Sequence, residues 1–282
     1  MHDKPLSALL GEVESDASWQ RLLEHVQANT PTDISAPRAL RPLVISALAR
    51  QRLVLAVTAT SREAEDLRAE LESFIDASSV AEFVSWETLP HERLSPSADV
   101  VGRRLATLRR LRHADEDHQN RIQVVVAPIR ALLQPLVAGI ADLTPVALHK
   151  GHAVEFDQAI ADLAAAGYAR VDLVEKRGQF AVRGGLIDVF PPAEEHPMRV
   201  EFWGDSVDEV RSFSVADQRS LGEVPEGLWA PPCRELLITD AVRIKARALI
   251  ETYPNLSEIL EKISEGIYVD GIEALEIGRA HV

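Results

Sequence analysis

Two short runs of apolar residues constrain the fold of this chain more than any other feature. They are LVLAVT at residues 53–58 and IQVVVA at residues 122–127. Runs of this length, rich in valine and leucine, are typical of strands buried on both faces. Strands of that kind occur in parallel sheets that helices cover from both sides. The two runs therefore predict a layered α/β core.

Helical patterns separate these runs. Residues 63–75 place Ala64, Leu67, Leu71 and Phe74 on one stripe, and Ser61 is the expected N-cap. Further helices are predicted at residues 19–27, 43–50, 98–113 and 128–136, and a short strand at residues 81–84. Because strand and helix alternate, we expect a doubly wound, mostly parallel first domain over residues 1–143.

The pattern changes at residue 144. Short strands joined by turns rich in Gly, Pro and Asp follow one another, with one helix at residues 155–165. The predicted strands are VALHK, ARVDLVE, QFAVRG, GLIDVF, MRVEFW and VDEVRSFSV. The sequence thus predicts an inserted antiparallel α+β module at residues 144–232. Helical patterns return in residues 233–282, which we expect to be the incomplete, C-terminally truncated start of the returning part of the first domain.

Composition limits the classes of function. The 282 residues carry a formal charge of −14, which repels nucleic acid, so a role on DNA is expected to act through a partner. The single cysteine, Cys233, excludes an internal disulfide and a cysteine-based zinc cluster. We find neither a signal peptide nor an apolar run long enough to cross a bilayer. A cytoplasmic protein with no membrane partner is expected.

The stretch where an α/β domain would hold a phosphate lacks the residues of a phosphate-binding loop. Residues 33–44 read DISAPRALRPLV, without a glycine or a Lys-Ser/Thr pair, so we do not expect this stretch to hydrolyse nucleotide. His91 and Glu92 lack the HExxH spacing of a zinc site, and His149 and His152 flank a turn where solvated rings are expected. The sequence therefore offers no catalytic residue, no metal site and no nucleotide-binding residue.

Positive charge collects in residues 102–113, GRRLATLRRLRH. Leu105, Leu108 and Leu111 form the inward stripe of this predicted helix. The arginines then belong to a solvated face, which we favour over a phosphate-binding stripe because no aromatic side chains alternate with them.

Alternation in MRVEFW separates two faces of a strand. Met198, Val200 and Phe202 form an apolar face, so Arg199 and Trp203 share the opposite one with Glu201. Trp and Arg are enriched at interface hot spots, which favours a binding surface. The alternative is that Trp203 covers a neighbouring helix; alternation does not separate the two.

Arg183 stands before two glycines, Gly184 and Gly185. A bulge or tight turn there would aim its guanidinium outward. An ion pair with Asp188 or Glu201 is the competing explanation.

Three long motifs make the chain resemble a known family. They are WETLPHERLSPSADVVGRRLATLRRL from residue 86, GYARVDLVEKRGQFAVRGGLIDVFPP from residue 167 and MRVEFWGDSVDEVRSFSVADQRSL from residue 198. In this order they resemble the N-terminal region of the bacterial transcription-repair coupling factors (Mfd) and, more distantly, the start of the excision-repair helicase subunit UvrB. Trp203 stands where some relatives have phenylalanine, and the final EIGRAHV departs from the family pattern.

The resemblance implies a fold and a partner. It implies a RecA-like domain that has lost its phosphate loop and is interrupted by a UvrB-like module that binds UvrA. Carried over motif by motif, the UvrA-binding residues are Arg183, Arg199 and Trp203. This stretch would be non-catalytic and hold no cofactor.

The resemblance also implies what whole family members do. Their further regions bind RNA polymerase and translocate on duplex DNA, with ATP and magnesium in motor domains, and so displace polymerase stalled at lesions. An intramolecular contact that shields those motors is a further expectation. The alternative function is a UvrB-type, nucleotide-dependent, damaged-DNA-binding helicase subunit.

Overall fold

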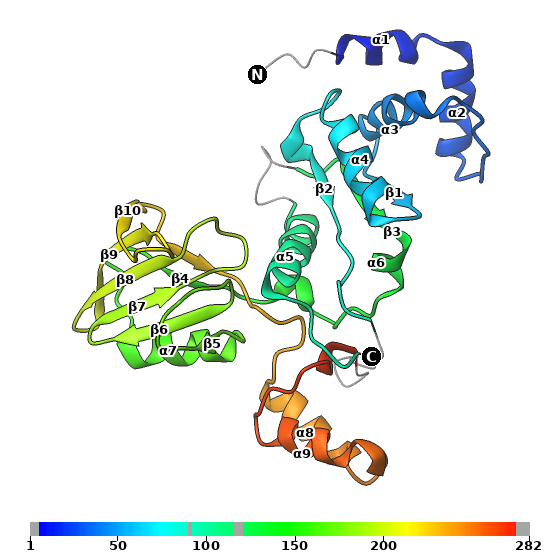
Figure 1. Ribbon diagram of the computed structural model, residues 1–282. Helices are drawn as coiled ribbons and strands as arrows, with labels where there is room; N and C mark the ends of the chain where they lie inside the picture. Colours follow the sequence, from blue (N-terminus) through cyan, green and yellow to red (C-terminus); the bar gives the residue numbers. More distant parts are fainter. Residues whose placement is uncertain (1–5, 90–91, 115–120, 275–282) are drawn as a thin grey trace. The chain divides into compact units, whose positions relative to one another are not determined.

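The computed structural model describes residues 6–89, 92–114 and 121–274. The chain divides into two compact units (Figure 1). The first unit comprises Met1–Ser85 and Arg109–Gln134, and the second comprises Trp86–Leu108 and Pro135–Val282. The boundary falls within helix α5 (Ala98–Arg112). The division at residues 143 and 232 expected from the sequence stays a prediction.

The first unit is built around a parallel sheet of three strands. The order is β1-β3-β2, and Val54 of β1 and Val80 of β2 both lie opposite Val124 of β3. All five residues of β3 are buried, as its apolar sequence predicted. The same expectation for LVLAVT was wrong, because Leu55 and Val57 of β1 are 53% and 49% exposed. The strands are β1 (Val54–Thr58), β2 (Val80–Glu82) and β3 (Val124–Pro128).

Helices α3 and α4 pack on this sheet through a shared apolar core. Ala47 of α3 and Leu67 and Leu71 of α4 are buried with Val124 and Val126. The N-cap of α4 is Thr60, whose hydroxyl accepts a hydrogen bond from Glu63 N–H, so the expected cap at Ser61 was wrong by one residue. The helices of this unit are α1 (Ala8–Glu14), α2 (Ala17–Gln27), α3 (Arg41–Ala49), α4 (Ser61–Leu71) and α6 (Ile129–Leu133), with 3₁₀ turns η1 (Arg38–Leu40) and η2 (Ala77–Ser79).

The second unit contains a six-stranded sheet in the order β10-β9-β8-β7-β6-β5. Neighbouring strands are antiparallel except β5, which runs parallel to β6, so the fully antiparallel meander that we predicted is corrected at this edge. The predicted strand ARVDLVE shrinks to the two residues of β5, and β10 was not predicted. The strands are β5 (Ala169–Arg170), β6 (Gln179–Arg183), β7 (Leu186–Val189), β8 (Met198–Trp203), β9 (Ser206–Phe213) and β10 (Ser220–Glu223).

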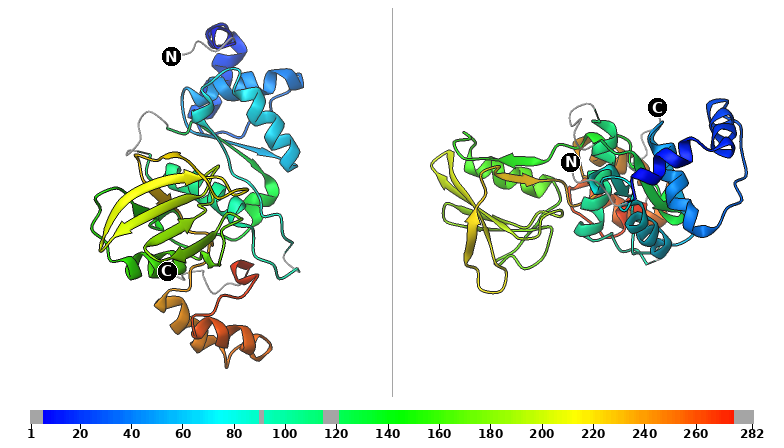
Figure 2. Two further views of the ribbon diagram at one scale, coloured as in Figure 1. Left: turned by 60° about the vertical axis from the view of Figure 1, so that its left-hand side comes forward. Right: turned by 90° about the horizontal axis from the view of Figure 1, so that it is seen from above.

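Helix α7 (Phe156–Ala165) covers one face of this sheet (Figure 1 and Figure 2). Ala159 and Leu163 of α7 are buried in one cluster with Ile187, Val200 and Val210 from three strands. We call this covered side the inner face. A separate two-stranded sheet pairs β4 (Val146–Leu148) with β11 (Leu228–Ala230).

A helical hairpin follows the sheets in sequence. Helices α8 (Asp240–Leu249) and α9 (Ser257–Ser264) bury Ala246, Leu260 and Ile263 in a small core that also includes Leu236 and Ile272. The remaining 3₁₀ turns are η4 (Ile140–Asp142), η5 (Pro254–Leu256) and η6 (Ile272–Ala274). Within the described ranges, none of the helices is both long and apolar enough to span a bilayer.

Helix α5 corrects the expectation of a fully solvated basic face. Arg104 is completely buried, and its Nε donates to Oε1 of the equally buried Glu235 at 2.5 Å. Trp86 Nε1 donates to the same oxygen at 2.9 Å. Of the predicted inward leucines, Leu105 is buried, whereas Leu108 and Leu111 are half-buried. Arg104 therefore belongs to the interior of the second unit, because a partner 131 residues away provides its counter-charge.

Candidate functional site

Strand register brings the three predicted binding residues onto one face of the six-stranded sheet. Arg183 lies opposite Leu186, which lies opposite Glu201, and Asp188 lies opposite Arg199. Side chains directly opposite each other in antiparallel strands share a face. Trp203 follows Glu201 by two residues on β8, so it lies on this side too. We call this side, opposite the inner face, the outer face.

Trp203 is the most exposed large apolar side chain on the outer face. Its exposed fraction is 85%, while Val200 and Phe202 on the same strand are buried. It is the last residue of β8, just before the turn at Gly204, where φ is +60°. The alternative that Trp203 covers a neighbouring helix is therefore wrong, because most of the indole faces solvent.

Arg199 is held from two sides. Its Nε and Nη2 donate to Oδ1 and Oδ2 of Asp188 at 2.7 and 2.8 Å, and its guanidinium carbon lies 4.7 Å from the ring centre of Phe213. Hydrogen bonding to Asp188 raises the pKa of Arg199 above its ordinary value. The side chain is 22% exposed and that of Asp188 is 3% exposed. Asp188 thus pairs with Arg199, and the ion pair with Arg183 that we considered is not formed.

Arg183 is exposed at the end of β6, and its Nη2 donates to the backbone oxygen of Asp172 at 2.8 Å. Gly184 and Gly185 form a two-residue connection to β7, and Arg183 and Leu186 remain paired across it. Gly184 has φ +58°, a conformation that glycine adopts without strain. The glycines therefore make a tight turn rather than a bulge.

Sequence reasoning named Asp188 and Glu201 but did not identify Arg199 as the partner of Asp188. Asp188 is buried, and Glu201 lies directly opposite Glu209, which forms an ion pair with Arg211. The signal for Asp188 was present, because it is the one charged residue inside the otherwise apolar strand LIDV. A buried carboxylate needs a cationic partner, but alternation does not identify that partner.

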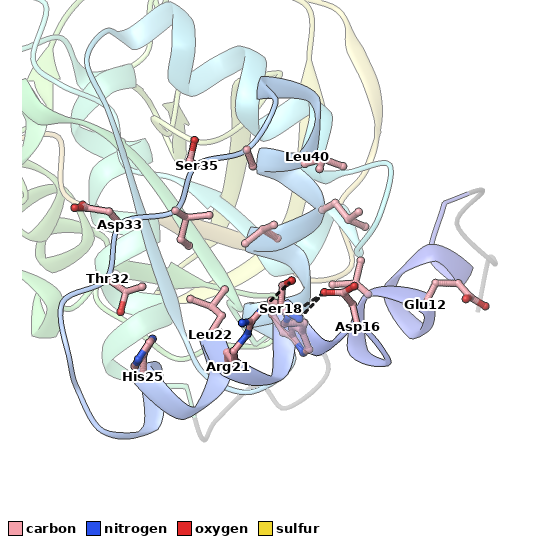
Figure 3. Close-up of a pocket in the computed structure, with 16 residues that line it drawn as sticks. Glu12, Asp16, Ser18, Arg21, Leu22, His25, Thr32, Asp33, Ser35 and Leu40 are labelled. Carbon is pink, nitrogen blue, oxygen red and sulfur yellow. Dashed lines mark hydrogen bonds between the residues drawn. The ribbon is translucent and has the colours of Figure 1, made fainter.

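The first unit has a groove of about 790 Å³ beside the stretch where a phosphate loop was sought. It lies between α1, α2, residues 32–36 and the start of α3, and its polar rim includes Glu12, Asp16, Arg21 and Asp33 (Figure 3). Backbone N–H groups of Ser18 and Trp19 hold the pKa of Asp16 below its ordinary value, so this carboxylate stays ionised. A triphosphate entering the groove would meet three carboxylates as well as Arg21, and among its described lining residues no lysine is present.

In the described ranges, the other histidines and the cysteine do not form a site. His149 and His152 stack with ring centres 4.7 Å apart; His149 is exposed and His152 is half-buried. Burial raises the pKa of the Cys233 thiol to about 12. Among the residues that the structure describes, no three His, Cys, Asp or Glu side chains converge as metal ligands. His91 lies outside the described residues.

Comparison with known proteins defines the class of this surface. Residues 146–231, which contain the six-stranded sheet, match the family model of the UvrB interaction domain. The six-stranded sheet thus belongs to a UvrB interaction domain.

Over nearly its whole length the chain is a homologue of part of the transcription-repair coupling factors. The factor of Mycobacterium tuberculosis (strain CDC 1551 / Oshkosh) is 47% identical over 97% of this chain. Those of Escherichia coli (strain K12) and Bacillus subtilis (strain 168) are 31% and 30% identical over 78% and 79% of it. The chain spans 23%, 19% and 18% of these three relatives.

Proposed function

We propose that this chain recruits the excision-repair protein UvrA through the outer face of its six-stranded sheet. The exposed indole of Trp203, on the same face as Arg199 and Arg183, carries the proposal. Tryptophan and arginine supply most of the binding energy in many protein interfaces. The UvrB interaction domain and the homology to coupling factors support UvrA as the partner.

Truncation of Trp203 tests the proposal. Trp203→Ala is expected to weaken UvrA binding by about 2 kcal/mol or more, because a large exposed aromatic side chain is removed from the proposed interface. Titration calorimetry with purified UvrA measures the change. Trp229→Ala is the matched control, since Trp229 is 49% exposed but lies on β11, outside the six-stranded sheet. Wild-type affinity of Trp203→Ala would contradict the proposal.

The role of the whole protein follows as a second part of the proposal. We infer that this piece delivers UvrA, and thereby excision repair, to sites where RNA polymerase is stalled at DNA damage. RNA polymerase, duplex DNA and ATP with magnesium would be bound by other regions of the full-length protein. The homology to coupling factors supports this role rather than that of a UvrB-type helicase subunit.

We further propose that the first unit is RecA-like without nucleotide binding, and that residues 1–143 and 233–282 form one domain around an inserted module at residues 144–232. The parallel order β1-β3-β2 with α3 and α4 supports the fold. Residues 33–44 have no glycine, and the adjacent groove is lined by the carboxylates of Glu12, Asp16 and Asp33 against one arginine, Arg21, which supports the loss of binding.

The chain is therefore expected to bind ATP no more tightly than millimolar. Titration of a fluorescent ATP analogue in the presence of magnesium measures this affinity. An unrelated ATP-binding protein serves as positive control for the analogue. Saturable binding at micromolar concentration would overturn the expectation and favour the UvrB-type alternative.

A further inference from the structure

Asp188 is a buried carboxylate on the side of the sheet that we propose as the UvrA-binding surface. It is 2% exposed, and both of its oxygens accept hydrogen bonds from one side chain, Arg199. A bidentate pair fixes both the distance and the plane of a guanidinium, which a single contact does not. Asp188 therefore determines how Arg199 lies on the outer face.

Phe213 limits the guanidinium from another direction. It is fully buried on β9, and the guanidinium carbon of Arg199 lies 4.7 Å from its ring centre. A cation held near an aromatic ring gains electrostatic stabilisation as well as a defined position. With Asp188 and Phe213 together, Arg199 is ordered before any partner arrives, so little side-chain entropy remains to be lost on binding.

The pair with Asp188 leaves part of the Arg199 guanidinium available to a partner. Nε and Nη2 are used by Asp188, whereas Nη1 makes no hydrogen bond within the part of the chain that the structure describes. Arg199 keeps 22% of its side chain exposed. Nη1, together with the second N–H of Nη2, is thus available to donate to an incoming oxygen acceptor.

We propose that Asp188 is a positioning residue of the partner-binding surface, which holds Arg199 so that its Nη1 donates to an oxygen acceptor of the partner. This inference rests on the proposed UvrA binding. A lysine at position 199 is not expected to serve the same role. Its ammonium group lacks the planar set of donors with which a guanidinium pairs with Asp188 and, at the same time, donates to a partner. The ordered pair, rather than the bare charge of Arg199, is then what the partner recognises.

A double-mutant cycle in UvrA affinity tests this inference. Asp188→Asn is expected to raise the dissociation constant about tenfold, because the asparagine amide keeps one acceptor for Nε of Arg199 but has none for Nη2. In an Arg199→Ala background, Asp188→Asn is expected to change the dissociation constant for UvrA less than about twofold, since Asp188 acts through Arg199. Arg199→Lys is expected to weaken binding as much as Arg199→Ala.

Controls separate positioning from stability. Val210→Ala destabilises the same sheet from its inner face and is expected to keep wild-type affinity when circular dichroism shows it folded. If Asp188→Asn does not fold, Phe213→Leu takes its place in the double-mutant cycle. Phe213→Leu is expected to lower the affinity for UvrA about threefold, and this loss is expected to disappear in the Arg199→Ala background.

The possible results distinguish the two proposals. If Trp203→Ala weakens binding but Asp188→Asn, or Phe213→Leu in its place, does not, the positioning role is wrong and UvrA recruitment stands. A loss that persists undiminished in the Arg199→Ala background also overturns positioning. If the wild-type chain does not bind UvrA, both proposals are wrong.

Discussion

Arg104→Met is expected to lower the free energy of unfolding of the second unit by about 3–5 kcal/mol, the usual cost of removing one partner from a buried ion pair. The side chains of Arg104 and Glu235 have exposed fractions of 0% and 1%, and Nε of Arg104 lies 2.5 Å from Oε1 of Glu235. Without the arginine, the buried Glu235 carboxylate would lose its cationic partner. The indole N–H of Trp86 would still donate to Oε1 of Glu235. Urea denaturation followed by circular dichroism measures the loss.

The double variant Arg104→Met/Glu235→Leu provides the control. It removes both charges and substitutes apolar groups of similar size, so it is expected to be more stable than Arg104→Met alone. A single variant as stable as the wild type would show that the pair contributes nothing. Since α5 and the segment after β11 are far apart in sequence, the pair joins elements that the chain order separates.

Arg199→Ala is the second substitution with a large expected effect. It should lower the free energy of unfolding by about 2–3 kcal/mol, because the buried Asp188 carboxylate loses both of its charged donors. Thermal and urea denaturation measure this change. Trp203→Ala, in contrast, is expected to alter stability by less than about 0.5 kcal/mol, since the indole is mostly exposed.

Arg211→Ala is the matched control for Arg199→Ala. Arg211 lies directly opposite Arg199 on β9 but is exposed and pairs with Glu209 at the surface. Its loss is expected to cost no more than about 1 kcal/mol. Equal stability of Arg199→Ala and Arg211→Ala would contradict the structural role of the Asp188 pair. A loss of UvrA affinity in Arg199→Ala therefore has to be measured where the variant is folded.

Local patterns predicted most of the helices and strands and the two faces of MRVEFW, but not the strand β10, the short length of β5 or the exposure of β1. The strand MRVEFW alternates in burial as its sequence predicted, and β3 is buried throughout as a continuous apolar run should be. Successive side chains of a strand point to opposite faces because of the backbone geometry, so this alternation can be predicted without knowing the neighbouring strands. The exposure of Trp203 was not determined in this way, because whether a helix covers a face depends on packing.

Pairings between distant residues could not be predicted. Asp188 was considered as the partner of Arg183, five residues away, but the register of β7 and β8 places Arg199 opposite it instead. Arg104 was assigned to a solvated face because its counter-charge, Glu235, lies outside any local pattern. Neither ion pair follows from the local sequence, because an ionic contact is decided by which elements meet in space.

The sequence by itself determined the alternating α/β pattern, the strand-rich module, the bare stretch at residues 33–44 and the family resemblance that points to Arg183, Arg199 and Trp203. The tertiary structure decided that Trp203 is open to solvent, that Arg199 is ordered by Asp188 and Phe213, and that Arg104 is buried. The reason is physical. Periodicity and backbone preference are local, whereas exposure and ion pairing depend on strand register and on packing between residues far apart in the chain.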